Sequence, residues 1–274
     1  MIKLEKTVLP SPEQWDAIIR GMRNPMNSWE KSDSGWIVES YRDNRPHIGY
    51  DSESGLVKVL GPNDYELMMK LAKGGSVHAK YRRMIVVYVD ITAPLYWWKE
   101  FDTYKVGTVA NSCSTMHKIH ERPFTVNDIS CETLRRGNGV DVHGNLDSPD
   151  LKAHYKHMTN VLSSLNNLRD LYLKTGDKKY WRCIIEMLPS SYNQKRTVML
   201  SYEVLANIYP SRKNHKLDEW HKFCDWIKGL PYSEIITGKE KEKPVDISTT
   251  PNTCVVCGEE IPEGRQVCPK CEKE

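Results

Sequence analysis

The chain has 274 residues, and its 39 Lys and Arg nearly balance its 36 Asp and Glu, so the net charge is +3. This charge gives no support for a strongly basic nucleic-acid-binding protein and leaves open only weak or local contact with nucleic acid. The longest apolar run, 84–89, is too short to span a membrane and no secretory signal is recognisable, so we expect a soluble, cytoplasmic protein.

The first half of the chain predicts short helices and strands. Ser11 followed by proline is typical of a helix start. Residues 50–60 suggest strands around a glycine turn, and residues 63–66 are expected to cap a helix that ends at Gly74. The β-branched run at 84–92 is the strongest predicted strand.

The second half, from 148 to about 209, is predicted to be mostly helical. Apolar residues at helical spacing indicate a long helix that Gly176 closes. Residues 181–187 and 197–208 are predicted as two further helices, and residues 217–227 as the last one.

Two Cys-x-x-Cys pairs near the end of the chain predict a structural zinc ribbon. Cys254, Cys257, Cys268 and Cys271 supply four thiolates, which form a closed tetrahedral site for Zn²⁺. Iron also suits four thiolates, and two disulfides would fit a secreted protein, but the absence of a recognisable signal favours zinc. The other cysteines have no repeated spacing and are expected to be buried free thiols: Cys113, Cys131, Cys183 and Cys224.

A charged segment separates this ribbon from the rest of the chain. Residues 237–253 lose the hydrophobic pattern and alternate in charge before a proline, as solvated linkers do. The predicted organisation is therefore a main domain at 1–236, a linker at 237–253 and a zinc ribbon at 254–274.

Two segments of contrasting composition follow the strongest predicted strand. Residues 94–105 are rich in aromatic side chains, and residues 106–117 are mostly small and polar. Helical spacing of the aromatic residues favours core packing over a surface that stacks a flavin or a base. The polar segment is either a solvated turn or a cradle for phosphate beside Lys105.

Two other groups allow functional interpretations that the pattern does not favour. Cys113 lies in the polar segment near His117 and His120, which allows an activated nucleophile. His154 and His157 lie one helical turn apart, but with no third ligand nearby they are expected on the surface rather than on a metal.

The order of strand, aromatic helix, Ser/Thr/Asn segment, long helical half with a Leu-Pro break and closing helix resembles the flavin-dependent thymidylate synthases. That family carries Arg-His-Arg-x-x-Ser-x-Asn-Glu-x-Ser-x-Arg after a helix that begins with proline and an aromatic residue. With one extra residue allowed, the signature falls on Thr103, Tyr104, Lys105, Thr108, Asn111, Ser112, Ser114 and Met116. The resemblance extends with gaps over residues 60–228. It implies an α+β fold, with an antiparallel sheet and long helices.

Further positions of the family fall outside the signature. Its glutamine falls on Glu100, and its Leu-Pro segment resembles 186–189, with Arg182 one turn from the arginine position. Its Glu-His before the strand falls on Arg82 and Arg83, which suggests added charge in the same cleft. Its last Asn, Arg and His resemble Asn207, Arg212 and His215.

The resemblance implies a homotetramer that binds FAD and a pyrimidine nucleotide, with a folate and NADPH as further partners. It assigns catalysis to Arg212 and Ser114. It assigns flavin binding to Tyr104, Lys105, Thr108, Asn111, Asn207 and His215. It assigns substrate binding to Glu100, Ser114, Arg182 and Arg212.

Departures from the signature leave two hypotheses. The triplet is Thr, Tyr and Lys here, so at most one positive charge remains, and lysine lacks the planar fork of arginine. The first hypothesis is a divergent flavin-dependent enzyme that methylates, alkylates or reduces a pyrimidine nucleotide, favoured by the retained Asn111, Ser114, Asn207, Arg212 and His215. The alternative is a non-catalytic protein that binds a nucleotide or nucleic acid and docks on a partner through the zinc ribbon.

Overall fold

A computed structural model describes residues 2–136 and 149–238. The chain divides into two units after Gly238, and the described residues all belong to the first unit. The predicted zinc ligands Cys254, Cys257, Cys268 and Cys271 therefore lie outside the described residues, and their role stays a prediction.

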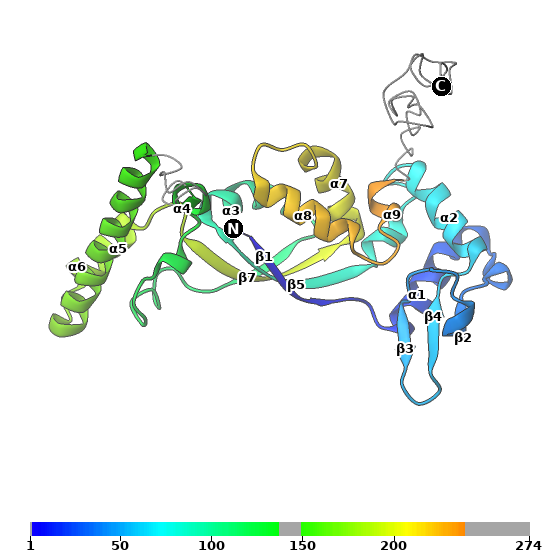
Figure 1. Cartoon of the computed structure of the whole chain (residues 1–274). Helices are drawn as coiled ribbons and strands as arrows, with labels where there is room; N and C mark the ends of the chain where they lie inside the picture. The colour runs from blue at the N-terminus through cyan, green and yellow to red at the C-terminus, as the bar shows by residue number, and fades with distance from the viewer. Residues whose placement is uncertain (1, 137–148, 239–274) are drawn as a thin grey trace, which may run out of the picture. The chain divides into compact units, whose positions relative to one another are not determined.

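The first unit contains both strands and helices, in an irregular order along the chain (Figure 1). The strands are β1 (Lys3–Val8), β2 (Gly35–Val38), β3 (Gly49–Asp51), β4 (Leu56–Val59), β5 (Val86–Pro94), β6 (Val109–Ser112) and β7 (Asn193–Ser201). The α-helices are α1 (Pro12–Arg23), α2 (Pro62–Lys73), α3 (Leu95–Phe101), α4 (Glu132–Arg136), α5 (Pro149–Thr175), α6 (Lys178–Met187), α7 (Tyr202–Arg212), α8 (Asp218–Lys228) and α9 (Glu234–Thr237). The result is an α+β fold, as predicted.

The central sheet has four antiparallel strands in the order β1-β5-β7-β6. Side chains alternate across β5, so that Val87, Val89 and Ile91 are fully buried while Tyr88 between them is exposed. Helices α7 and α8 lie over one face of this sheet (Figure 1). Strand β6 is an edge strand, and all four of its residues are exposed.

The N-terminal part packs α1 and α2 with a three-stranded sheet in the order β2-β4-β3. Helix α1 begins as predicted, because the Ser11 hydroxyl accepts from the Gln14 backbone amide and the Gln14 side chain accepts from the Ser11 amide. Helix α2 begins at Pro62, and the Asp33 carboxylate accepts from two amides of its first turn. The predicted cap within 63–66 is therefore wrong, because the capping carboxylate comes from a distant part of the sequence.

A network of polar groups around Asp64 joins α1, α2 and the segment between them. The buried Asp64 carboxylate accepts from the Arg23 guanidinium at 2.6 Å. It also accepts from the hydroxyl groups of Ser32 and Ser34 and from the backbone amides of Asp33 and Ser34. We call these residues the Asp64 network. Because each oxygen is bonded, the buried charge is compensated on all sides.

Helices α5 and α6 lie side by side and form a second, smaller core (Figure 1). Helix α5 ends as predicted at Gly176, whose φ of +69° is one that glycine adopts without strain. Leu165 of α5 and Ile184 of α6 are fully buried between the helices and the 119–131 segment. His154 and His157 are exposed on α5, which agrees with the surface position expected for them.

Two predictions in the central sheet were wrong. Residues 197–201 were assigned to a helix but belong to β7, and the helix that follows begins only at Tyr202. Strand β7 pairs with β5 along its whole length and with β6 on its other side. Pairing on both sides overrides the local helical pattern. Residues 109–112, in the segment predicted as a polar loop, form the edge strand β6 because they pair with β7.

The aromatic residues of α3 are mostly core residues, as their spacing predicts. Trp97, Trp98 and Phe101 are buried against Trp220 and Phe223 of α8. Cys131 and Cys224 are buried free thiols, as predicted. The same prediction is wrong for Cys113, which is exposed, and for Cys183, which is only half-buried. None of the helices in the described ranges combines the length and apolarity that a membrane crossing requires.

Candidate functional site

Five polar and aromatic side chains from three segments meet beside α3. Glu100 lies in the last turn of α3, Tyr104 follows this helix, Arg212 ends α7, His215 lies between α7 and α8, and Trp220 lies in α8. We call these residues the Glu100 cluster. Four of the five are residues that the resemblance assigns to flavin or substrate, and the fold brings them together across more than a hundred positions of the sequence.

One oxygen of Glu100 is the centre of this cluster. Its Oε2 accepts from Nη1 of Arg212 and from Nε1 of Trp220, each at 2.9 Å. It also lies 3.3 Å from Nε2 of His215. The backbone amide of Leu217 donates to Nδ1 of His215, which leaves the imidazole hydrogen on Nε2, facing Glu100.

The Arg212 guanidinium is held by two further contacts. Its Nε donates to the Tyr104 hydroxyl at 2.8 Å, and its plane lies over the Trp220 ring, 4.6 Å from the ring centroid. Among the described residues, no hydrogen bond or ion pair engages Nη2 of Arg212 or Oε1 of Glu100. The two side chains are 17% and 35% exposed. The cluster therefore offers one free donor and one free acceptor side by side in a fixed orientation.

A second feature is the pocket beside Ser114, which has a volume of about 540 Å³. The Ser114 hydroxyl accepts from the backbone amides of Met116 and His117, so the segment folds back in a tight turn. The basic side chains that line the pocket are Lys118, Arg122 and Lys195. We call this the Ser114 pocket. Hydroxyl groups with three cations are suited to an anion such as phosphate.

The cations of the Ser114 pocket are already paired with carboxylates. Burial raises the pKa of Asp128, but hydrogen bonds from Arg122 and Thr125 outweigh it and bring this pKa below its ordinary value. The Asp90 carboxylate likewise raises the pKa of Lys195, at 2.9 Å. Lys118 pairs with Glu121. An anion in this pocket would therefore compete with carboxylates for its partners.

The residues predicted to hold a flavin next to Tyr104 lie along the approach to β6. Lys105 is exposed in the turn after α3, and Asn111 is exposed on β6 opposite Thr197. The Thr108 hydroxyl is buried and has no hydrogen-bond partner among the described residues. A buried hydroxyl without a partner is costly and is a feature often completed by a ligand.

Two predicted site residues join neither the Glu100 cluster, nor the Ser114 pocket, nor the group near β6. Arg182 is 70% exposed on α6 and pairs with Glu186 at 2.8 Å. Asn207 is exposed on α7. Arg82, which was expected to add charge to the cleft, is instead buried and bonded to Glu203 at 2.7 Å.

The structure adds residues that the sequence did not single out for the site. Trp220 was predicted only as part of the helix at 217–227, although an indole N–H near Arg212 and His215 in sequence was the available signal. Lys195 and Arg122 gave no signal, because they reach the Ser114 pocket only through the pairing of β7 and the fold of the 113–124 segment.

Neither metal chemistry nor a cysteine nucleophile is assembled in residues 2–136 and 149–238. No group of three or more His, Cys, Asp or Glu side chains in these ranges is arranged to hold a metal ion. No hydrogen bond among the described residues joins Cys113 to His117 or His120. The nucleophile interpretation of Cys113 thus gains no support.

No protein-family model matches the chain, and no curated protein matches it in sequence. Its structure is similar to thymidylate synthase ThyX from Helicobacter pylori, solved with FAD and dUMP, with a TM-score of 0.51 and 16% identity over 85% of this chain and 94% of that one. A second complex of that enzyme with FAD and dUMP gives the same TM-score and identity and is covered to 95%.

The structure is also similar to the UMP/dUMP methylase PolB from Streptomyces cacaoi bound with 5-Br dUMP. Here the TM-score is 0.50 and the identity 14%, over 86% of this chain and 94% of that one. At such low identity these similarities establish the fold and no more. The described chain has the fold of ThyX and PolB.

Proposed function

We propose that this chain is a divergent flavin-dependent enzyme that acts on a pyrimidine nucleotide by methylation, alkylation or reduction. The observation that carries the proposal is the Glu100 cluster. The resemblance assigns Glu100, Tyr104, Arg212 and His215 to ligands, and polar contacts link these four residues in the order Tyr104, Arg212, Glu100, His215.

In this proposal Arg212 and Glu100 hold the edge of the pyrimidine ring. The free Nη2 of Arg212 donates to a ring carbonyl and stabilises negative charge that develops there during reaction. The free Oε1 of Glu100 accepts from a ring N–H or an exocyclic amine. Trp220 and Tyr104 fix the guanidinium, so that little orientational freedom is lost when the nucleotide binds.

The Ser114 pocket is proposed as a separate site for a phosphate group. Its Thr92 and Lys195 lie on the uncovered face of the central sheet, whereas the Glu100 cluster contacts α8 on the other face. Arg122 and Lys195 supply cations to this site, and they come from parts of the chain outside the signature. Ser114 adds a hydroxyl group at the wall of the pocket. The nearby carboxylates make this a moderate rather than a strong anion site, because each cation has a competing partner.

The described residues fit a flavin beside β6. The orphaned Thr108 hydroxyl supplies a donor and acceptor, and the exposed edge of β6 supplies backbone groups that suit the polar edge of the flavin ring. Lys105 is the exposed cation that precedes β6 and would take the pyrophosphate, and Asn111 is exposed on β6 itself. When bound, a flavin supplies the hydride for reduction, and the protein supplies position and electrostatics.

Oligomerisation and the remaining partners belong to the same proposal. The uncovered face of the central sheet exposes Tyr88 and Val109, and Met84 lies exposed before β5. Apolar side chains beside an open edge strand support a homo-oligomer, and the resemblance makes it a tetramer. A folate, NADPH and a structural Zn²⁺ complete the proposed ligands. Sedimentation velocity checks the oligomer, and metal analysis of the purified chain checks the zinc.

Flavin binding is tested by the absorbance spectrum of the purified chain and by its titration with FAD. We expect Thr108→Val to weaken FAD binding about tenfold, because it removes one hydroxyl without changing the side-chain shape. The fold should not lose stability, since that hydroxyl has no partner within the described residues. Thr103→Val is the matched control, because the Thr103 hydroxyl donates to the Glu100 carbonyl on the exposed surface. A colourless protein that takes up no FAD would contradict the proposal of a flavin-dependent enzyme.

The substrate is tested by tritium release from [5-³H]dUMP with FAD, NADPH and methylenetetrahydrofolate present. Release that depends on protein supports a reaction at the pyrimidine C5 position. Binding of FAD and dUMP without release, with any pyrimidine nucleotide, favours the second candidate function. That candidate is a non-catalytic nucleotide-binding protein, and the observation in its favour is that Arg212, Arg122 and Lys195 are all paired with carboxylates.

A further inference from the structure

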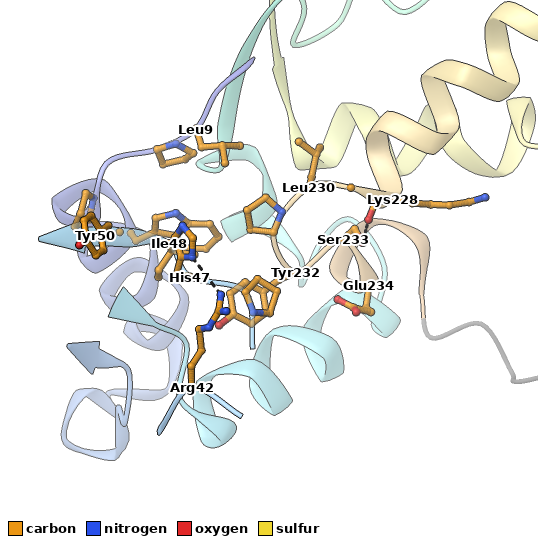
Figure 2. Close-up of a pocket in the computed structure, with 17 residues that line it drawn as sticks. Leu9, Arg42, His47, Ile48, Tyr50, Lys228, Leu230, Tyr232, Ser233 and Glu234 are labelled. Atoms are coloured by element: carbon orange, nitrogen blue, oxygen red, sulfur yellow. Dashed lines mark hydrogen bonds between the residues drawn. The ribbon is translucent and has the colours of Figure 1, made fainter. Parts of the chain in front are cut away.

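A separate cavity of about 620 Å³ lies between the N-terminal three-stranded sheet and the connection from α8 to α9 (Figure 2). Its walls come from 9–15, from 42–50 and from 228–234. None of its lining residues belongs to the Glu100 cluster or the Ser114 pocket. Its volume lies in the range of pockets that hold small organic molecules.

The walls of this cavity are mostly apolar and rigid. Four prolines line it: Pro10, Pro12, Pro46 and Pro231. Leu9, Leu230 and Ile48 add aliphatic surface, and Tyr50 adds an exposed aromatic ring. Proline and aromatic surfaces lose little conformational entropy when they are covered, so such walls suit a planar apolar body.

One end of the cavity is cationic. Nη1 of Arg42 lies 3.3 Å from Nδ1 of His47, as Figure 2 shows, and Nδ1 accepts there because the guanidinium can only donate. Nε2 of His47 therefore carries hydrogen and is a second donor. Arg42 pairs with the carboxylate of Glu39, with 3.7 Å between Nη2 and Oε1. Because the Glu39 side chain is 60% exposed, it neutralises the guanidinium poorly.

The other charged residues of the cavity, Lys228 and Glu234, do not neutralise the positive charge at the Arg42 end. Lys228 extends away from the cavity in Figure 2, and its ammonium group binds Asp225 at 3.1 Å. In Figure 2, Glu234 lies on the α9 side of Tyr232, whereas Arg42 lies on the other side of it. The cavity thus has an apolar body and one end with two hydrogen-bond donors.

A strained residue holds the wall between these groups. Tyr232 has a φ of +53°, which a bulky side chain rarely adopts, and it is buried. Its hydroxyl accepts from the Leu60 amide at 2.9 Å, and its ring packs 5.7 Å from that of Tyr65. Strain of this kind persists where the surroundings enforce it, often at ligand sites.

We infer that this cavity binds a small organic anion, with a planar aromatic body against the proline and aromatic walls and one carboxylate or phosphate group on Arg42 and His47. The shape and polarity of the cavity select both parts of the ligand. An uncharged ligand leaves the two donors without an acceptor, and a small inorganic anion leaves the apolar walls exposed. The inference does not depend on the proposed flavin chemistry.

The test uses 2-naphthoate and its uncharged analogue 2-naphthamide, titrated calorimetrically into the full chain. We expect saturable binding of one naphthoate per chain, at least about tenfold tighter than naphthamide, because a charged hydrogen-bonded pair is lost with the amide. Inorganic phosphate alone should bind at least about tenfold more weakly than naphthoate, because it covers no apolar wall. Equal binding of the two naphthyl probes, or none, overturns the inference.

Variants locate the binding. Arg42→Gln is expected to weaken naphthoate about tenfold and to leave naphthamide unchanged, and Ile48→Trp is expected to abolish both by filling the cavity. Lys228→Gln is the matched control and should change neither, since its ammonium points away. Thermal unfolding checks that each variant is folded. Unchanged naphthoate binding in both the Arg42 and Ile48 variants contradicts the inference, even if naphthoate binds elsewhere on the chain.

Discussion

Two Arg–carboxylate pairs of the same chemistry have opposite surroundings in this molecule. Arg23 and Asp64 have side chains 4% and 0% exposed, and both Asp64 oxygens are bonded. Arg212 and Glu100 are partly open, and each keeps one terminal atom without a bond among the described residues. The first pair is complete within the fold, and the second has capacity left for a ligand. Saturation of hydrogen bonds, rather than residue type, separates the structural pair from the candidate functional one.

The largest effect is expected from Asp64→Ala. It leaves the Arg23 guanidinium buried without its carboxylate, and removal of one partner of a buried pair costs about 3–5 kcal/mol. Urea unfolding measures the loss. Asp170→Ala is the control, because the Asp170 side chain is exposed beside Arg169 and should change stability by less than about 0.5 kcal/mol. Similar losses of unfolding free energy in the two variants would contradict a structural role for the Asp64 network.

A second prediction concerns acid. Burial raises the pKa of Asp64, but hydrogen bonds from Ser34, Ser32 and Arg23 outweigh it, so the folded-state pKa lies below the ordinary value of 3.8. The unfolded chain then takes up this proton more readily than the folded one. The stabilisation by Asp64 is therefore complete above 3.8 and is lost as the pH falls through that value toward the folded-state pKa.

Unfolding curves of the wild type and of Asp64→Asn across this pH range check the direction. The advantage of the wild type should be largest near neutral pH and should shrink in acid. An advantage that grows as the pH falls would mean that Asp64 is protonated in the folded chain, and the contrast with Glu100 would have to be withdrawn.

Arg212→Ala, in contrast to Asp64→Ala, is expected to reduce ligand affinity strongly and stability only slightly. The loss of stability should stay near or below about 1 kcal/mol, because the pair is partly exposed and screened by water. Affinity for dUMP, measured by calorimetry, should fall at least about tenfold if Arg212 holds the ring. Lys213→Ala is the control at the next position, since Lys213 makes no contact with the Glu100 cluster in the described chain. A large loss of stability with unchanged dUMP binding would make Arg212 a structural residue like Arg23.

The smallest expected effect is that of Tyr104→Phe. This change removes the hydroxyl that accepts from Nε of Arg212 and keeps the ring. The guanidinium gains freedom, and dUMP affinity should fall about two- to fivefold, in keeping with a net hydrogen bond of about 0.5–1 kcal/mol. No change in affinity would show that Trp220 and Glu100 alone fix the orientation of Arg212.

Local chemistry in the sequence was sufficient for many elements of the fold. The Ser11 cap, the end of α5 at Gly176 and the strand before Pro94 follow from side-chain hydrogen bonding, from glycine at positive φ and from β-branched residues. Strand β7 was not predictable in this way. Its residues fit a helix locally and become a strand only between β5 and β6.

The residues of the candidate site also fall into two groups, those indicated by the sequence and those that only the fold reveals. Glu100, Tyr104, Arg212 and His215 were named through the resemblance, which already contains information about distant contacts. Trp220 and Lys195 were missed because their part in the site depends on which side-chain atoms the fold brings into contact. Arg82 is a similar case, since only the fold shows that its guanidinium forms a buried ion pair with Glu203.

The exposed edge of β6 also has a consequence for handling the protein. Its unpaired backbone groups and exposed Val109 form a template onto which another strand can add. Unless a second copy or a ligand covers that edge, concentrated preparations should tend to aggregate through it. Turbidity at rising protein concentration, with and without FAD, is therefore a simple readout of whether anything occupies the strand that carries Asn111.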